Sequence, residues 1–275
     1  MKHTNIIAEI GINHQGDVNL FKRMMVAAKR CGVDAVKGQK RVPKLCYNPE
    51  KYNEPCGDRT YGEAKEELEL SNEEWVELMR FADEISIPLF ASTWDIPSAR
   101  FMRDIGTTVI KISSASLVDL PLLKEVASYG LSIILSTGMS ALGEIDTAVD
   151  ILKNTDLTLL HCTASYPCKC ENINLLMIPE LKKRYGLPVG FSGHHVSVAL
   201  DAPAVALGAC MVERHFTLDR AMKGTDHAAS LEPPGMEHVV KYIRATEVAL
   251  GTNKKTVLDC ELGSIEKLRG YLKRS

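Results

Sequence analysis

The chain has 275 residues, and 45% of them are hydrophobic, which is enough to bury a large core and excludes a disordered protein. Its 33 Lys and Arg residues nearly balance its 35 Asp and Glu residues, so no broad field attracts nucleic acid or anionic lipid. The first residues hold too short an apolar stretch for a signal peptide, and no run approaches the roughly 18 apolar residues of a membrane span. We therefore expect a cytoplasmic protein with no nucleic-acid or membrane partner.

Eight short runs rich in β-branched and other apolar residues predict strands, and each is followed by a segment with helical apolar spacing. The predicted strands span residues 5–13, 35–40, 87–93, 108–115, 132–138, 157–164, 187–194 and 210–216. The predicted helices span residues 20–32, 72–85, 96–106, 120–130, 142–154, 175–186, 197–208 and 235–251. Most of these helices close with glycine, which tolerates the left-handed conformation at a helix end.

Eight alternating strand and helix units predict an α/β fold, a (β/α)₈ TIM barrel built as a single domain over residues 1–255. The two longest connections follow the second and the eighth strands. A doubly wound open sheet is the alternative, but no Gly-x-Gly-x-x-Gly fingerprint follows the first strand to support it. In a barrel the active site lies at the C-terminal ends of the strands, so polar residues at those ends are the candidate site.

Every predicted strand carries such residues near its C-terminal end. They include Glu9, Lys37, Gln39, Thr93, Lys111, Ser114, Ser136, Tyr166, Ser192, His194, Glu213 and His215. Residues two apart on a strand share a face, so we expect these side chains to converge on one mouth. Charged groups inside a barrel are costly to desolvate unless they are paired or bound to a ligand. The pattern therefore favours a charged substrate over a set of isolated structural hydrogen bonds.

The residue types at this mouth suggest two kinds of ligand. Two lysines and several hydroxyls suit a phosphate or carboxylate, because ammonium groups supply charge and hydroxyls supply directed donors. His194 and His215 lie on consecutive strands, and two neutral imidazoles with oxygen ligands suit a divalent metal with open positions. The alternative is that the two histidines only form hydrogen bonds across the barrel.

Several long sequence motifs of the chain resemble those of a known protein family. The stretches "AEIGINHQGD", "KISSASLVDLPLL", "LLHCTASYP", "LPVGFSGH" and "VERHFTLDRAMKGTDHAASLEP" resemble the catalytic barrel of the sialic acid synthase family. That family includes N-acetylneuraminate synthases, animal-type sialic acid phosphate synthases and their legionaminic, pseudaminic and spore-coat relatives. The resemblance implies an enzyme that condenses phosphoenolpyruvate with an N-acetylmannosamine-type sugar, or its 6-phosphate. The products would be a nine-carbon 2-keto acid and phosphate.

The resemblance also implies a role for each matching residue. His194 and His215 would hold a divalent metal, Mn²⁺ first, with Mg²⁺ or Co²⁺ as alternatives. Phosphoenolpyruvate would bind to Lys37, Lys111, Ser114, Ser136 and Ser192. The sugar would be oriented by Glu9, Gln39, Thr93, Tyr166 and Asp226. Glu213 lies beside the metal, and either Glu9 or Glu213 would handle protons, so Glu9, Glu213, Lys37 and Lys111 form the expected catalytic set.

Three further expectations follow from the resemblance. Gly38 stands where the family commonly has a bulky aromatic residue, so looser packing is expected beside Lys37. Family members usually continue past the barrel into a small antifreeze-like domain, and residues 256–275 resemble the start of the linker to that domain, so we expect either a natural bare barrel or a fragment of a longer protein. Family likeness also suggests a homodimer.

Two other functions are alternatives to the expected condensation reaction. One is another phosphoenolpyruvate-dependent synthase of keto-deoxy sugar acids, which would share the barrel and the chemistry but use a different sugar. The other is a non-catalytic barrel that binds phosphoenolpyruvate or a sugar without turning it over.

Overall fold

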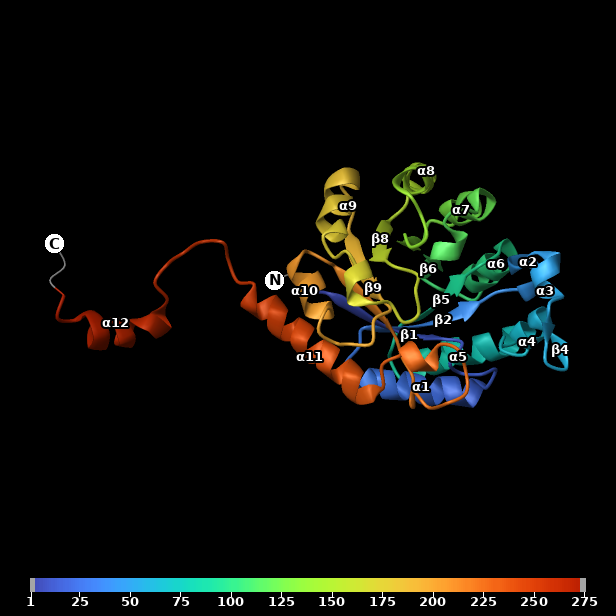
Figure 1. The fold of residues 1–275 in the computed structure, drawn as a ribbon, viewed down its shortest axis with the longest axis horizontal. Helices are drawn as coiled ribbons and strands as arrows, with labels where there is room; N and C mark the ends of the chain where they lie inside the picture. The colour runs from blue at the N-terminus through green and yellow to red at the C-terminus, as the bar shows by residue number, and fades with distance from the viewer. Residues whose placement is uncertain (1–2, 273–275) are drawn as a thin grey trace.

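A closed barrel of eight parallel strands forms the centre of the protein, and the computed structural model describes residues 3–272 (Figure 1). The strands follow the order β1-β10-β9-β8-β7-β6-β5-β2 around the barrel. They are β1 (Asn5–Gly11), β2 (Ala35–Lys40), β5 (Leu89–Thr93), β6 (Val109–Ile112), β7 (Ser132–Ser136), β8 (Leu157–Cys162), β9 (Val189–Gly193) and β10 (Met211–His215). Because β1 pairs with both β2 and β10, the sheet closes, which confirms the predicted TIM barrel and rules out the open sheet.

Eight helices cover the outside of the barrel, as the apolar spacing predicts (Figure 1). They are α1 (Val18–Arg30), α5 (Asn72–Glu84), α6 (Ile96–Asp104), α7 (Leu120–Ala127), α8 (Leu142–Leu152), α9 (Met177–Tyr185), α10 (Asp201–Ala206) and α11 (Pro233–Ala249). Ser71 caps α5 in a capping box with Glu74. The helix α10 is shorter than predicted, because the carbonyl of Ser197 accepts a hydrogen bond from Arg214 at 3.2 Å instead of continuing a helix.

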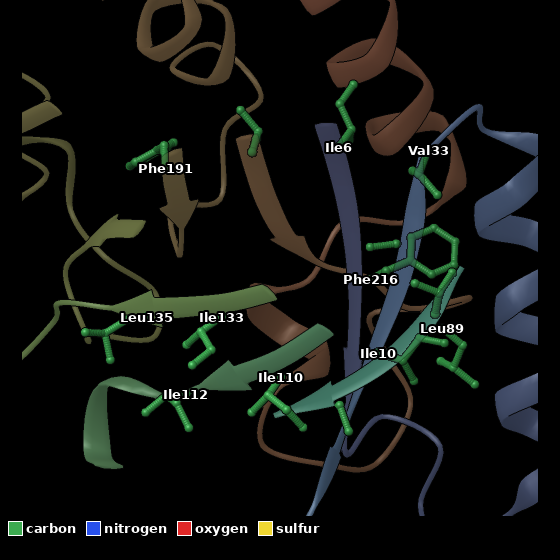
Figure 2. Packing of buried hydrophobic residues seen from close by; sticks show 14 of the residues in the cluster. Ile6, Ile10, Val33, Leu89, Ile110, Ile112, Ile133, Leu135, Phe191 and Phe216 are labelled. Carbon is green, nitrogen blue, oxygen red and sulfur yellow. The ribbon is translucent and has the colours of Figure 1, made fainter. Parts of the chain in front are cut away.

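Strand alternation divides the apolar residues into two sets. Outward side chains such as Ile6, Ile110 and Ile133 pack in the main core between the strands and the helices (Figure 2). Inward side chains form a second, smaller cluster inside the barrel. It consists of Ile7, Phe90, Ile134 and Leu160. This cluster is an apolar plug, and the residues two positions further along the same strands are expected to face the space above it.

The connection between β2 and α5 has structure that the sequence did not predict. It contains α2 (Pro43–Cys46), α3 (Pro49–Tyr52), α4 (Tyr61–Glu66) and a two-stranded antiparallel hairpin of β3 (Pro55–Cys56) and β4 (Arg59–Thr60). We call residues 41–70 the β2–α5 insertion. Helices of four to six residues and strands of two residues are too short to leave a periodic signal, so only their contacts with one another define them.

The expectation of looser packing at Gly38 is wrong. A Cβ atom at this position would lie 2.8 Å from the ring of Phe21 and 2.9 Å from the ring of Trp75. These two aromatic side chains are fully buried and already occupy the space outside β2. Gly38 is therefore needed because a larger residue would collide with the core.

The chain continues past the barrel as a separate segment. After α11 it forms a short 3₁₀ turn, η4 (Asp259–Glu261), and α12 (Leu262–Arg269), which lies apart from the barrel (Figure 1). Three more 3₁₀ turns lie within the barrel's connections: η1 (Ser114–Ser116), η2 (Cys170–Asn172) and η3 (His227–Ala229). Residues 273–275 of the predicted 256–275 segment lie outside the described residues. Between residues 3 and 272, no helix is both long and apolar enough to cross a membrane.

Candidate active site

A cavity of about 280 Å³ opens at the C-terminal end of the barrel, above the apolar plug. All predicted site residues except Thr93 line it. They are Glu9, Lys37, Gln39, Lys111, Ser114, Ser136, Tyr166, Ser192, His194, Glu213, His215 and Asp226. The first layer above the plug is polar because the apolar and polar residues of each strand are two positions apart, as with Ile7 and Glu9 on β1.

Thr93 has a different place from the one expected. It is fully buried, and its hydroxyl finds no hydrogen-bond partner among the described residues. The two residues on either side of it, Ser92 and Trp94, line the cavity instead. Successive side chains of β5 alternate between the cavity and the helices, and Thr93 shares the outward face with Leu89 and Ala91 of the main core. The expected contact of Thr93 with a sugar is therefore corrected.

A buried ion cluster lies at the floor of the cavity. The ammonium group of Lys37 is 2.6 Å from Glu9 and 3.4 Å from Glu213. Burial alone would lower the pKa of Lys37, but Glu213 and Glu9 raise it above its usual value. Lys37 is therefore charged and is held between two carboxyl groups.

The two carboxyl groups of this cluster have different environments. Burial raises the pKa of Glu9, although Lys37 opposes the rise. Burial would also raise the pKa of Glu213, but Lys111, Lys37 and the hydroxyl of Ser192 lower it to about 2. Glu213 is thus a fixed negative charge, whereas Glu9 is the carboxyl group that holds a proton more readily.

Lys111 is the deep cation without a carboxylate partner. It is 2% exposed, and its ammonium group donates to Ser136 Oγ at 2.7 Å and to the carbonyl of Ile112 at 3.2 Å. No carboxylate among residues 3–272 forms an ion pair with it, and burial lowers its pKa, against the opposing charge of Glu213. A buried cation whose only side-chain hydrogen-bond partner in the described chain is one hydroxyl group is suited to receive an anion.

Ser114 lines the same cavity. Its Oγ accepts a hydrogen bond from the backbone N–H of Gly138 at 3.0 Å and contacts Cys162 Sγ at 3.2 Å. Gly138 has little spare room, since a Cβ atom there would lie 2.8 Å from Ser114 Oγ. The ends of β6, β7 and β8 therefore meet closely around Ser114.

The two predicted metal ligands lie side by side on consecutive strands. Their ring centroids are 5.6 Å apart, and the Tyr166 ring lies 4.2 Å from His194 and 5.6 Å from His215. Nδ1 of His194 is 2.8 Å from the carbonyl of Thr163, which can only accept, so Nδ1 carries the proton. Burial and the neighbouring His215 lower the pKa of His194 to about 4. Its Nε2, which lies 3.4 Å from Ser192 Oγ, is therefore unprotonated at neutral pH.

The donor set fits a divalent metal ion with open positions. Nδ1 of His215 is buried without a hydrogen-bond partner in the described chain and lies 3.9 Å from Asp226 Oδ2. No third His, Cys, Asp or Glu among residues 3–272 completes a three-ligand group. Two imidazoles would thus leave several coordination positions for water or substrate.

Arg214 fixes the backbone of the residues that follow β9 through an ion pair and a hydrogen bond. It stands between Glu213 and His215 but points out of the barrel, where its Nη1 is 2.5 Å from Asp201 Oδ2. Its Nη2 donates to the carbonyl of His195 at 2.5 Å. Arg214 and Asp201 are both buried, so they fix the backbone beside His194 from outside the cavity.

Several cavity residues were missed by sequence reasoning. Ser92, Trp94 and Cys162 line the cavity from strands β5 and β8 or the residues after them. Strict alternation from Phe90 and Leu160 would have found Ser92 and Cys162. Arg41 and Lys65 come from the β2–α5 insertion, in which no site residue was expected.

The chain is similar to known proteins in sequence and in fold. A model described as the NeuB family matches residues 24–255. Human N-acetylneuraminate-9-phosphate synthase is 39% identical over 271 residues, covering 96% of this chain and 76% of the human protein. The N,N'-diacetyllegionaminic acid synthase of Campylobacter jejuni is 37% identical over 283 residues, covering 99% of this chain and 85% of that protein. The N-acetylneuraminic acid (sialic acid) synthetase of Leptospira borgpetersenii, crystallised with citrate, has a TM-score of 0.87 and 33% identity, covering 99% of this chain and 93% of that one.

Proposed function

Because the chain belongs to the NeuB family, we propose that it condenses phosphoenolpyruvate with an N-acetylmannosamine-type sugar or its 6-phosphate. The products are a sialic acid-type nine-carbon 2-keto acid and phosphate. The observation that carries this proposal is the buried Lys111, hydrogen-bonded to Ser136, which shares one cavity with further serine hydroxyl groups, an ion cluster and a histidine pair. An anionic enol ester and an aldehyde can lie together in such a site.

Phosphoenolpyruvate occupies the wall made by Lys111, Ser114 and Ser136 in this proposal. Lys111 supplies a positive charge that no carboxylate of the described chain neutralises by an ion pair, and the serine hydroxyls supply directed donors. Lys37 lies further round the barrel between Glu9 and Glu213, so it contributes charge while staying fixed in position. The enol carbon is thereby held in a set orientation for attack on the aldehyde.

Glu9 and Gln39 orient the sugar near the reacting carbons. The Gln39 amide donates to Glu9 Oε1 at 3.3 Å, so the two side chains form a joined polar surface. Glu9 is the group we assign to proton transfer, because it lies on the cavity wall beside Lys37. The Tyr166 ring covers the histidine pair and limits the access of water to it.

His194 and His215 would hold a divalent ion, which we propose is Mn²⁺, with Mg²⁺ or Co²⁺ as alternatives. A bound ion would polarise the sugar aldehyde as a Lewis acid. The chain prepares the two ligands by fixing the His194 tautomer through the carbonyl of Thr163 and by leaving Nδ1 of His215 without a hydrogen-bond partner in the described chain.

Phosphate release tests the proposed reaction. The protein is incubated with phosphoenolpyruvate, Mn²⁺ and N-acetylmannosamine or its 6-phosphate, and phosphate is expected only when enzyme, phosphoenolpyruvate and sugar are all present. Release only with sugar phosphates that lack the N-acetyl group would instead identify another keto-deoxy sugar acid synthase. Binding of phosphoenolpyruvate without release for any sugar would identify a non-catalytic barrel.

His215→Ala is expected to abolish metal-dependent turnover and to weaken Mn²⁺ binding, because it removes one of only two imidazole ligands. Titration calorimetry measures Mn²⁺ binding independently of activity. His238→Ala is the matched control, since His238 is exposed on α11 and stacks on Tyr242 away from the cavity. Full activity and unchanged Mn²⁺ affinity in His215→Ala would end the metal assignment.

A further inference from the structure

Asp226 reaches the active-site cavity from a loop instead of a strand. Among the described residues three acidic side chains line the cavity, and two of them, Glu9 and Glu213, lie on β1 and β10. Asp226 precedes the 3₁₀ turn η3 in the connection between β10 and α11, residues 216–232, which we call the β10–α11 loop. Its Oδ2 lies 3.9 Å from His215 Nδ1. The place of this carboxylate therefore depends on the contacts that hold the loop.

Backbone hydrogen bonds fix the two ends of the β10–α11 loop beside the barrel. The N–H of Phe216 donates to the carbonyl of Glu9 at 2.7 Å, and Phe216 forms a parallel bridge with Leu231. The N–H of Leu231 donates to the carbonyl of His215 at 2.8 Å. These bonds hold the loop where it leaves and rejoins the barrel, but Asp226 lies several residues from either end.

One buried amide joins the two arms of the loop. Asn13 follows β1, is fully buried and is not one of the residues that line the cavity. Its Nδ2 donates to the carbonyl of Phe216 at 2.8 Å and to Ser230 Oγ at 2.9 Å, which uses both hydrogens of the amide. Ser230 Oγ in turn donates to the carbonyl of Asp226 at 2.7 Å. A continuous path of hydrogen bonds thus runs from the end of β1 to the backbone of Asp226.

His227 holds the other side of the same turn. It follows Asp226, is fully buried, and its Nδ1 lies 2.7 Å from Thr217 Oγ1. The loop backbone passes close to its ring, since a Cβ atom at Gly224 would lie 2.7 Å from His227 Cδ2. Asp226 is therefore flanked by fixed residues on both sides before any ligand binds.

The Asp226 carboxylate itself has few contacts that could hold it independently of its backbone. Its Oδ1 accepts a hydrogen bond from Thr225 Oγ1 at 2.7 Å, and Thr225 belongs to the same loop and would move with it. The 3.9 Å between Oδ2 and His215 Nδ1 is too long for a hydrogen bond. A shift of the loop would therefore carry the carboxylate away from its place in the cavity.

We propose that Asn13 is a positioning residue that fixes the β10–α11 loop to β1 and thereby sets the Asp226 carboxylate against the sugar. The inference rests on the proposed function, in which Asp226 is expected to orient the sugar. Asn13 does not line the cavity, so it acts through Ser230 and the backbone of Asp226. A displacement of about 1 Å in a group that orients a substrate is enough to slow a reaction strongly.

Steady-state kinetics with phosphoenolpyruvate and N-acetylmannosamine or its 6-phosphate test this role. Asn13→Leu keeps the volume of the side chain but removes both donors. It is expected to lower kcat/KM for the sugar about tenfold, the size of effect that one lost hydrogen bond can have. KM for phosphoenolpyruvate should stay unchanged, because Lys111 and Ser136 lie on β6 and β7.

A double-mutant cycle separates positioning from a merely structural role. In an Asp226→Ala background, Asn13→Leu should cause no further loss of kcat/KM, because the group that Asn13 positions is gone. A general loss of structure would lower activity in both backgrounds. Ser230→Ala breaks the same path one step later and should lower kcat/KM for the sugar in the same way, so it decides the question if Asn13→Leu does not fold.

Thr107→Val is the matched control. It also removes the hydrogen bond of a buried side chain, since Thr107 Oγ1 donates to the carbonyl of Val109 at 3.0 Å. Thr107 precedes β6, at the end of the barrel opposite the cavity, so this variant should keep the wild-type kcat/KM.

Hydrogen–deuterium exchange of the unliganded protein gives a readout that needs no turnover. Asn13→Leu and Ser230→Ala should speed amide exchange in residues 217–231 and leave the barrel strands unchanged, because the path of hydrogen bonds that holds this segment is broken. Thr107→Val should leave exchange in the same segment as it is in wild type.

The outcomes separate the two proposals. Faster exchange confined to residues 217–231, with a loss of kcat/KM that disappears in the Asp226→Ala background, supports the role of Asn13. Unchanged exchange in that segment, or exchange that rises equally in the strands, overturns it. A loss that persists in the Asp226→Ala background, or a raised KM for phosphoenolpyruvate, also overturns it while turnover upholds the proposed function. If wild-type protein turns over no sugar, the proposed function fails, and exchange alone decides whether Asn13 holds the loop of Asp226.

Discussion

Lys111→Met is expected to lower kcat/KM for phosphoenolpyruvate roughly a hundredfold, which corresponds to about 3 kcal/mol for the loss of one buried charge opposite an anion. The reason is that Lys111 is the deep cation that no carboxylate of the described chain neutralises by an ion pair, and its hydroxyl partner Ser136 carries no charge. Phosphate release at varied phosphoenolpyruvate concentrations measures the effect.

The same substitution is expected to cost the unliganded protein less stability than Lys37→Met does, because it removes a costly buried ammonium but also one of the two lysine charges that keep Glu213 ionised. A buried ammonium without a carboxylate partner is costly, and burial already lowers the pKa of Lys111. Phosphoenolpyruvate should raise the melting temperature of wild type but not of Lys111→Met. Lys124→Met, an exposed lysine on α7, is the control and should keep both activity and protection. A variant at Lys111 with normal KM for phosphoenolpyruvate would contradict the anion site.

Lys37→Met is expected to lower the free energy of unfolding by about 3–5 kcal/mol, the usual cost of removing one partner from a buried ion pair. Lys37 lies 2.6 Å from Glu9 and 3.4 Å from Glu213, and its side chain is 4% exposed. Without Lys37, the two carboxyl groups would remain buried with less compensation. Urea unfolding followed by circular dichroism measures the loss.

Two companion variants make this prediction specific. Lys22→Met removes a surface ion pair with Glu77, and we expect a loss of no more than about 1 kcal/mol. The double variant Lys37→Met/Glu9→Gln should recover part of the stability lost in Lys37→Met, because one buried charge is gone. If Lys37→Met lowers the free energy of unfolding by no more than Lys22→Met does, the buried ion cluster contributes little to stability and this prediction is wrong.

The barrel was predictable because its signals are local. Each strand is a short apolar run, each helix has apolar residues on one face, and the glycines after α6, α7 and α9 adopt positive φ angles that end those helices. The β3–β4 hairpin was missed for the same reason, since each strand has only two residues and no period. The Gly38 position was also misjudged, because Phe21 and Trp75, which fill the space beside it, come from α1 and α5.

Most of the candidate site was predictable from the ends of the strands. Placing Lys111, Ser136 or His194 required only the rule that barrel sites form where parallel strands end. Thr93 was placed wrongly because one step along a strand reverses the direction of the side chain, and the last polar residue of β5 faces the helices. Arg41 and Lys65 reach the cavity through a long insertion, whose path depends on contacts such as Tyr47 with Tyr61.

The sequence by itself determined which side chains of each strand alternate and which end of the barrel is polar, because a strand repeats every two residues whatever surrounds it. Only the tertiary structure decided which charges are paired and which are free. Glu9 and Glu213 come together at Lys37 because β1 pairs with β10 and β2 when the barrel closes, and Lys65 reaches the rim only after the insertion has folded against it. Such pairings depend on distances between residues far apart in the chain, which no local pattern encodes.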